Sequence, residues 1–107
     1  MRTGLEFRST VRRGVRAGRS TLVVHARHVD SPTLVGFVVS TAVGNAVRRN
    51  RVKRRLRHLV RPLLEQHPHG LHVVVRALPA AAAAGDELGA DLANAWARCI
   101  HKLEQTS

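Results

Sequence analysis

The chain has 107 residues, enough for one modest hydrophobic core and too few for two, so we expect a single domain over residues 1–107. Its net charge is +11 with the histidines counted as neutral, a balance typical of proteins that bind nucleic acid. A membrane-surface helix would need aromatic anchors beside its charges, but the chain has only two Phe and one Trp. The composition therefore argues against a membrane partner.

Cysteine usage and the N-terminal residues indicate the compartment. The single cysteine, Cys99, excludes an intramolecular disulfide and fits a reducing environment. The first ten residues lack the apolar stretch of a secretory signal. We therefore expect a cytoplasmic protein.

The first third of the chain predicts one helix followed by two strands. Apolar side chains recur at helical spacing over residues 5–17, which predicts a short helix that ends near Gly18. Residues 20–29 and 34–40 are rich in β-branched side chains and alternate in polarity. Because a turn-forming segment separates these two stretches, we expect them to form an antiparallel hairpin.

A long amphipathic helix of about 20 residues is predicted next. Asn45 is a favourable N-cap for it. Its apolar stripe is formed by Val52, Leu56, Leu59, Val60 and Leu63. At 100° per residue the opposite side carries Asn50, Arg54, Arg57 and Arg61, with Arg51, Lys53 and His58 beside them. We therefore expect one side of this helix to be buried and the other to be cationic.

The last third of the chain predicts a strand and a final helix. Pro68 and Gly70 end the basic helix, and residues 71–78 are typical of a mostly buried strand. Residues 79–85 form an alanine-rich linker, either loose or a disordered helix start, to which we assign no function. A last helix with a regular apolar stripe follows. The expected fold is α+β, a two-layer sandwich of helices on a small sheet.

The sequence contains no strong candidate for a catalytic or metal-binding site. The acids are scattered, and the only group, Asp86, Glu87 and Asp91, is explained by helix capping. His67, His69 and His72 lie around a Pro and a Gly with no fourth ligand in sight, so a polar loop is the better interpretation.

Cys99 lies on the apolar stripe of the last helix and is typical of a small core residue. We therefore expect no catalytic residue and no metal site in the protein.

The basic stretch is the strongest feature. Residues 48–58 contain seven Arg or Lys together with His58, and no acid occurs between Asp30 and Glu65. Such uncompensated repulsion destabilises the free protein, and the usual reason to carry it is a polyanionic partner.

Residues 40–57, STAVGNAVRRNRVKRRLR, closely resemble the signature of the bacterial ribonuclease P protein component. The matching positions are Gly44, Asn45, Ala46, Val47, Arg49, Asn50, Arg51, Lys53, Arg54 and Arg57. The resemblance covers nearly the whole chain, through Phe7, Gly14, Arg19, the VGFVVS stretch and a VVV strand that ends at Pro79. In contrast, Thr41 and Ala42 stand where the signature has two lysines, and Leu78 stands where relatives often have arginine.

The resemblance implies a small protein partner of a catalytic RNA that removes the 5′ leader from precursor tRNA. The RNA performs the chemistry, and magnesium is bound mainly by that RNA. The implied fold has three helices on a small mixed sheet, with a left-handed strand, helix, strand crossover. DNA is not an implied partner.

The resemblance also implies two RNA-binding surfaces. The catalytic RNA is expected on Asn45, Arg48, Arg49, Asn50, Arg51, Lys53, Arg54 and Arg57. The single-stranded leader is expected in a cleft between the first helix and the sheet, on Phe7, His25, Arg27 and Arg76. Phe7 matches the aromatic residue of that cleft, with core packing as the alternative, and His25 stands where relatives often have an aromatic ring.

Two other functions are weighed against this one. A structural RNA-binding protein of the ribosomal type would use the same basic helix to hold phosphates. A DNA-binding helix-turn-helix would need a short helix before the basic one, where the VGFVVS stretch is strand-like instead.

Overall fold

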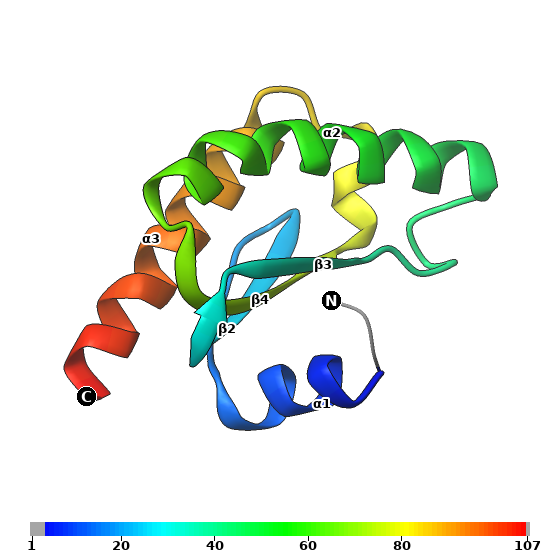
Figure 1. The fold of residues 1–107 in the computed structure, drawn as a ribbon. Coiled ribbons are helices and arrows are strands. Elements are labelled where there is room, and N and C mark those ends of the chain that lie inside the picture. Colours follow the sequence, from blue (N-terminus) through cyan, green and yellow to red (C-terminus); the bar gives the residue numbers. More distant parts are fainter. Residues whose placement is uncertain (1–3, 107) are drawn as a thin grey trace.

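The computed structural model describes residues 4–106, with side chains described over residues 8–105. The elements are α1 (Gly4–Arg13), β1 (Val15–Gly18), β2 (Leu22–Pro32), β3 (Leu34–Val38), α2 (Ala46–Gln66), β4 (His69–Ala77), the 3-10 helix η1 (Pro79–Ala83) and α3 (Glu87–Thr106). Figure 1 shows them in one compact body. In the described part of the chain, no helix is both long and apolar enough to cross a membrane.

The four strands form one mixed sheet in the order β1-β2-β4-β3. β2 pairs antiparallel with both β1 and β4, whereas β3 pairs parallel with β4. β3, α2 and β4 therefore make the strand, helix, strand crossover that the resemblance implies. The left-handedness of this crossover stays a prediction.

The predicted hairpin of residues 20–29 with 34–40 is wrong. β2 and β3 follow each other along the chain, but β4 lies between them. The reason lies in β4, whose residues 71–75 are all buried. A strand buried on both faces belongs in the middle of a sheet, so β4 separates the two strands that the turn chemistry suggested as partners.

The first helix is shorter than predicted and an additional strand follows it. α1 ends at Arg13, and Val15–Gly18 form the edge strand β1. The break lies at Gly14, whose backbone N–H donates to the Thr10 carbonyl at 3.0 Å. A Cβ at Gly14 would overlap the Ala26 carbonyl oxygen, so the chain can turn against β2 only with glycine there.

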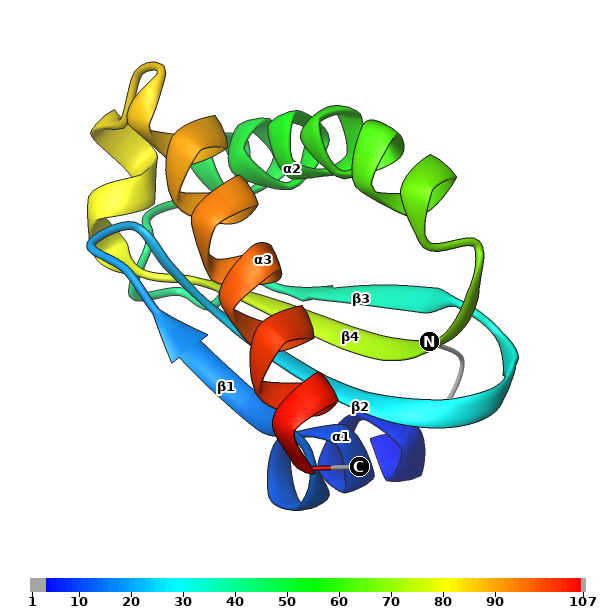
Figure 2. The same cartoon turned by 90° about the vertical axis from the view of Figure 1, so that its left-hand side faces the viewer.

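The helices cover both faces of the sheet. Figures 1 and 2 show α2 and α3 over one face and α1 against the other. The main core lies between the sheet and α2 and α3, and includes Leu22, Val24, Val75, Leu56 and Leu92. The sheet and the layer of α2 and α3 are thus the two predicted layers, and α1 packs on the opposite face of the sheet.

Three local expectations in the last third are corrected. Of the three histidines expected in a polar loop, only His67 lies in the connection after α2. His69 begins β4 and His72 is buried within it, because the strand extends back from the valine run. Residues 79–83 form η1 with Ala81 buried, so this segment packs and is not a loose linker. Asp91 lies inside α3, where its Oδ2 accepts from the Thr21 N–H at 3.1 Å and hydroxyl at 2.8 Å.

Candidate nucleic-acid interface

The start of α2 is determined by Gly44 and Asn45. The Asn45 side chain accepts a hydrogen bond from the Arg48 N–H at 3.0 Å, which confirms the predicted N-cap. Gly44 has a φ of 150°, and a Cβ there would lie 2.8 Å from Cδ of Arg48. Both residues therefore have a structural role at the helix start, which sets where the basic face begins.

The apolar stripe of α2 fixes the direction in which its cations point. Val52, Leu56 and Val60 are buried against the core, and Leu59 and Leu63 are half-buried beside them. The exposed predicted residues are Asn45, Arg48, Asn50, Arg51, Arg54 and Arg57, which we call the α2 basic face. The amphipathic helix predicted from spacing is confirmed.

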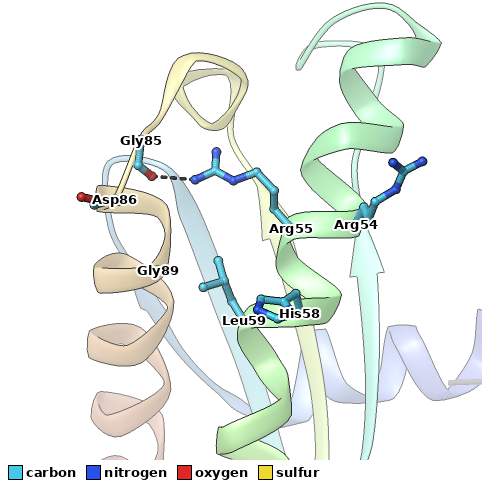
Figure 3. Close-up of a pocket in the computed structure, with 7 residues that line it drawn as sticks. All are labelled: Arg54, Arg55, His58, Leu59, Gly85, Asp86 and Gly89. Carbon is cyan, nitrogen blue, oxygen red and sulfur yellow. Dashed lines mark hydrogen bonds between the residues drawn. The ribbon is translucent and has the colours of Figure 1, made fainter.

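The remaining cations of the stretch are more enclosed. Arg49 and Lys53 are half-buried, and Arg49 Nε is buried without a hydrogen-bond partner among the described residues. Arg55 turns towards the segment between η1 and α3, where its guanidinium donates to the carbonyls of Ala84 at 2.6 Å and Gly85 at 2.7 Å. Figure 3 shows this contrast, with Arg55 reaching Gly85 and Arg54 pointing away from it.

A cavity of about 460 Å³ lies between α2 and the start of α3. It is lined by Arg54, Arg55, His58, Leu59, Gly85, Asp86 and Gly89 (Figure 3). Arg54 belongs to both the cavity and the α2 basic face, so this hollow continues that face towards α3.

A second cavity, of about 290 Å³, separates α1 from the sheet, and we call it the α1 cleft. It is lined by Arg8, Val11, Arg12, Val38, Val74 and Arg76. Arg76, predicted for the leader, is therefore brought together with two arginines of α1 over an apolar floor. Sequence reasoning missed Arg8 and Arg12, although their spacing of four residues places them on one side of a helix.

His25 and Arg27 lie on the same side of the sheet as Arg76. The register pairs His25 with Val74 and Arg27 with His72, so these side chains share the face that α1 covers. His25 is only 6% exposed, and burial, with help from Arg76 and Arg16, lowers its pKa below the ordinary value of 6.5. A neutral imidazole therefore lies under this face.

Arg27 is half-buried, and its Nε is buried without a hydrogen-bond partner in the described part of the chain. The backbone of Phe7 lies in α1, but its side chain is outside the described residues, so the choice between leader contact and core packing stays a prediction.

The described residues offer little for metal binding or nucleophilic chemistry. No group of three His, Cys, Asp or Glu among them is placed to hold a metal ion. The Cys99 thiol donates to the Val24 carbonyl at 3.4 Å, and its burial raises its pKa to about 11. At neutral pH this thiol is protonated and unreactive.

Comparison with known proteins gives consistent matches. A family model described as Ribonuclease P matches residues 1–100. A ribonuclease P protein component from Kocuria rhizophila is 51% identical over 104 residues, covering 95% of this chain and 92% of the relative. Another from a Nocardioides species is 53% identical over 107 residues, covering 96% of this chain and 89% of the relative.

Solved structures show the same fold. The Staphylococcus aureus RNase P protein matches with a TM-score of 0.79 at 21% identity, covering 89% of each chain. The Thermotoga maritima RNase P protein matches with a TM-score of 0.76 at 24% identity, covering 88% of this chain and 91% of that one. These likenesses confirm the α+β fold with a mixed sheet and three helices.

Proposed function

The chain belongs to the ribonuclease P protein family, and from that premise we propose that it holds two RNAs, the catalytic RNA on α2 and the 5′ leader of precursor tRNA in the α1 cleft. As a member of this family it is a subunit of an endoribonuclease that acts in tRNA processing. Its relatives are not ribosomal proteins, so the ribosomal alternative finds no support among them.

The observation that carries the proposal is the presence of two cationic surfaces on opposite sides of the sheet. Figure 1 shows α2 over one face of the sheet and α1 over the other. The α2 basic face and the α1 cleft therefore lie on opposite sides of the sheet. A protein that held one RNA helix would need one such surface. Two surfaces with different shapes suit two RNAs with different shapes.

The α2 basic face fits a folded RNA. Its exposed arginines project from a rigid helix that is anchored by Val52, Leu56 and Val60. A guanidinium matches the geometry of phosphate oxygens with two parallel hydrogen bonds, and a fixed row of them can recognise how phosphates are spaced. We assign this face to the catalytic RNA.

The α1 cleft fits a single strand. It combines Arg8, Arg12 and Arg76 with an apolar floor of Val38 and Val74. Sites for single-stranded nucleic acid pair such a cationic groove with aromatic side chains on which bases stack. Phe7 is the predicted stacking residue.

The chemistry belongs to the RNA in this proposal. Magnesium would be bound mainly by the catalytic RNA and would supply Lewis-acid stabilisation of the phosphodiester cleavage there. The contribution of the protein is to position the substrate and to neutralise phosphates near it.

The first test concerns the α2 basic face. Replacing Arg51, Arg54 and Arg57 by alanine should weaken binding to the catalytic RNA and flatten its dependence on salt, by about 0.7 to 0.9 in log-log slope for each lost phosphate contact. The measurement is affinity across a salt series, with thermal unfolding to show that the fold is intact. An unchanged slope would remove these arginines from the interface.

The second test concerns the α1 cleft. Arg76→Ala, and separately Phe7→Ala, should weaken precursor tRNA binding by the assembled enzyme and spare mature tRNA, which has no leader. Loss of one stacking contact is worth about 1 to 3 kcal/mol, so the Phe7 effect should be at least several-fold. An equal loss for both tRNAs, together with early unfolding, would identify Phe7 as a core residue.

A functional assay separates this function from the ribosomal alternative. Added protein should stimulate precursor tRNA cleavage by the cognate catalytic RNA at low magnesium, where the RNA alone is poorly neutralised. Absence of stimulation would favour the alternative.

A further inference from the structure

A third group of cations lies at the edge of the sheet, away from both surfaces described above. A cavity of about 440 Å³ between β1 and α3 is lined by Arg16, Ala17, Gly18, Arg19, Arg98 and Lys102, and we call it the β1–α3 cavity. Four of its six lining residues are cations and none is an acid. Figure 2 shows β1 and α3 side by side along this edge.

The fold explains only one of the four cations. Lys102 Nζ donates to the Arg16 carbonyl at 2.6 Å, which ties α3 to β1 and covers part of an edge strand. The other three, Arg16, Arg19 and Arg98, are exposed. Like charges converging on one hollow repel each other, so a polyanion is the partner that this arrangement fits.

The sheet register connects this cavity to the α1 cleft. Val38 pairs with Arg76, Arg76 pairs with Val23, and Val23 pairs with Gly18, so one row of residues crosses all four strands. The row begins at Val38 and Arg76, which line the α1 cleft, and ends at Gly18 on the edge strand β1, where the β1–α3 cavity lies towards α3 on the other side of the sheet. Three steps between strands span roughly 14 Å, a distance that an extended RNA strand crosses within a few nucleotides.

The neighbouring row runs from Gly36 through Val74 and His25 to Arg16, and of these four residues only Arg16 is exposed. His25 pairs with Arg16 of β1, and Arg76 of β4 pairs with Val23 two residues before His25, so both arginines lie near His25 and help to lower its pKa.

We propose that the β1–α3 cavity binds phosphates of the precursor tRNA leader beyond the nucleotides held in the α1 cleft, so that the leader crosses the sheet from β3 to β1. This inference rests on the proposed leader function of the cleft. The competing occupant is the catalytic RNA. The N-terminal end of α2, where the basic face begins, and the C-terminal end of α3 lie at opposite ends of the molecule (Figure 1), which favours the leader.

The test uses the enzyme assembled from the full chain and its cognate catalytic RNA. The variant is Arg98→Glu and the matched control is Arg61→Glu, because both residues are exposed helical arginines with no hydrogen bond among the described residues. The substrates are mature tRNA and precursors with leaders of about two and about ten nucleotides, the longer within the range that single-strand-binding domains occupy. Equilibrium affinity is measured over a salt series.

The expected result is specific to leader length. Arg98→Glu should weaken binding of the long-leader precursor by about threefold to tenfold and lower its salt slope by about 0.7 for each lost phosphate contact. Binding of the short-leader precursor, mature tRNA and the catalytic RNA should be unchanged. Arg61→Glu should not discriminate between the leaders. A double variant, Arg19→Ala with Arg98→Ala, should reproduce the effect without introducing a negative charge.

Other outcomes overturn the proposal. Weaker binding of the catalytic RNA by Arg98→Glu would identify the cavity as a catalytic-RNA contact, and no change with any substrate would identify it as a solvated surface. If the wild-type enzyme prefers the short-leader precursor to mature tRNA but gains nothing from a longer leader, the cleft assignment stands and the extended path fails. If the wild-type enzyme binds neither precursor more tightly than mature tRNA, the cleft assignment and the extended path both fail.

Discussion

The two faces of the sheet are both buried but are built from different side chains. Adjacent residues of β4 show the contrast, since Val73 and Val75 belong to the main core whereas His72 and Val74 lie on the side of α1. The buried strand residues on the face under α2 and α3 are apolar. The same side of the sheet as α1 holds His25, His72 and three arginines of the strands, Arg16, Arg27 and Arg76. One face supplies stability, and the other keeps polar groups beneath a cleft that can accept a ligand.

The largest difference between the faces is expected from two neighbouring valines. Val75→Ala should lower the free energy of unfolding by about 2 to 3 kcal/mol, because it removes two buried methyl groups from the main core. Val74→Ala should cost less, because Val74, although as fully buried as Val75, lies outside the main core and borders the α1 cleft. Chemical denaturation measures the free energy of unfolding of both variants. Equal costs would mean that the α1 side is packed as tightly as the core.

A smaller effect is expected on the packed side from Arg55. Arg55→Ala should lower the free energy of unfolding by about 1 to 2 kcal/mol, because two charge-assisted hydrogen bonds to Ala84 and Gly85 are lost from a partly solvated site. Arg54→Ala is the matched control, since its side chain is exposed and points away from α3. It should leave stability nearly unchanged while weakening binding to the catalytic RNA. The reverse pattern would exchange the roles of the two arginines.

The smallest effect is a pH dependence on the α1 side. The folded protein lowers the pKa of His25, mainly by burial and then by Arg76 and Arg16, so the unfolded chain binds a proton more readily. The stability contributed by neutral His25 is therefore complete above pH 6.5, the ordinary pKa of histidine, and is lost as the pH falls through the lowered pKa. As the pH is lowered over that window, the melting temperature of His25→Gln should fall less steeply than that of the wild type. Parallel curves would show that His25 is not the group responsible.

The sequence predicted the helices well because their signals are local. The N-cap of Asn45 and the apolar spacing of α2 depend on residues within a few turns of each other, and both are confirmed. β1 was missed because four residues at a sheet edge, only one of them buried, carry no clear alternation. The pairing of β2 with β4 could not be derived from the turn between β2 and β3, because it depends on a strand made about 40 residues later.

The same distinction applies to the two candidate surfaces. The exposed residues of α2 could be predicted because they lie on one helix. The α1 cleft could be predicted only through the family resemblance, and Arg8 and Arg12 were not identified, because their meeting with Arg76 depends on how α1 packs against β4. The assignment of particular side chains to the catalytic RNA or to the leader stays a prediction for both surfaces.

The central position of β4 has a consequence for biosynthesis. β4 is the last strand to leave the ribosome, yet β2 and β3 can join one sheet only through it. Until residue 77 has emerged, β2 and β3 each lack their common neighbour, and a nascent chain of this charge can remain extended without collapsing. Sheet assembly is therefore a late, cooperative event with long loop closure, and a chain truncated within α2 should expose unpaired strands and be prone to aggregation.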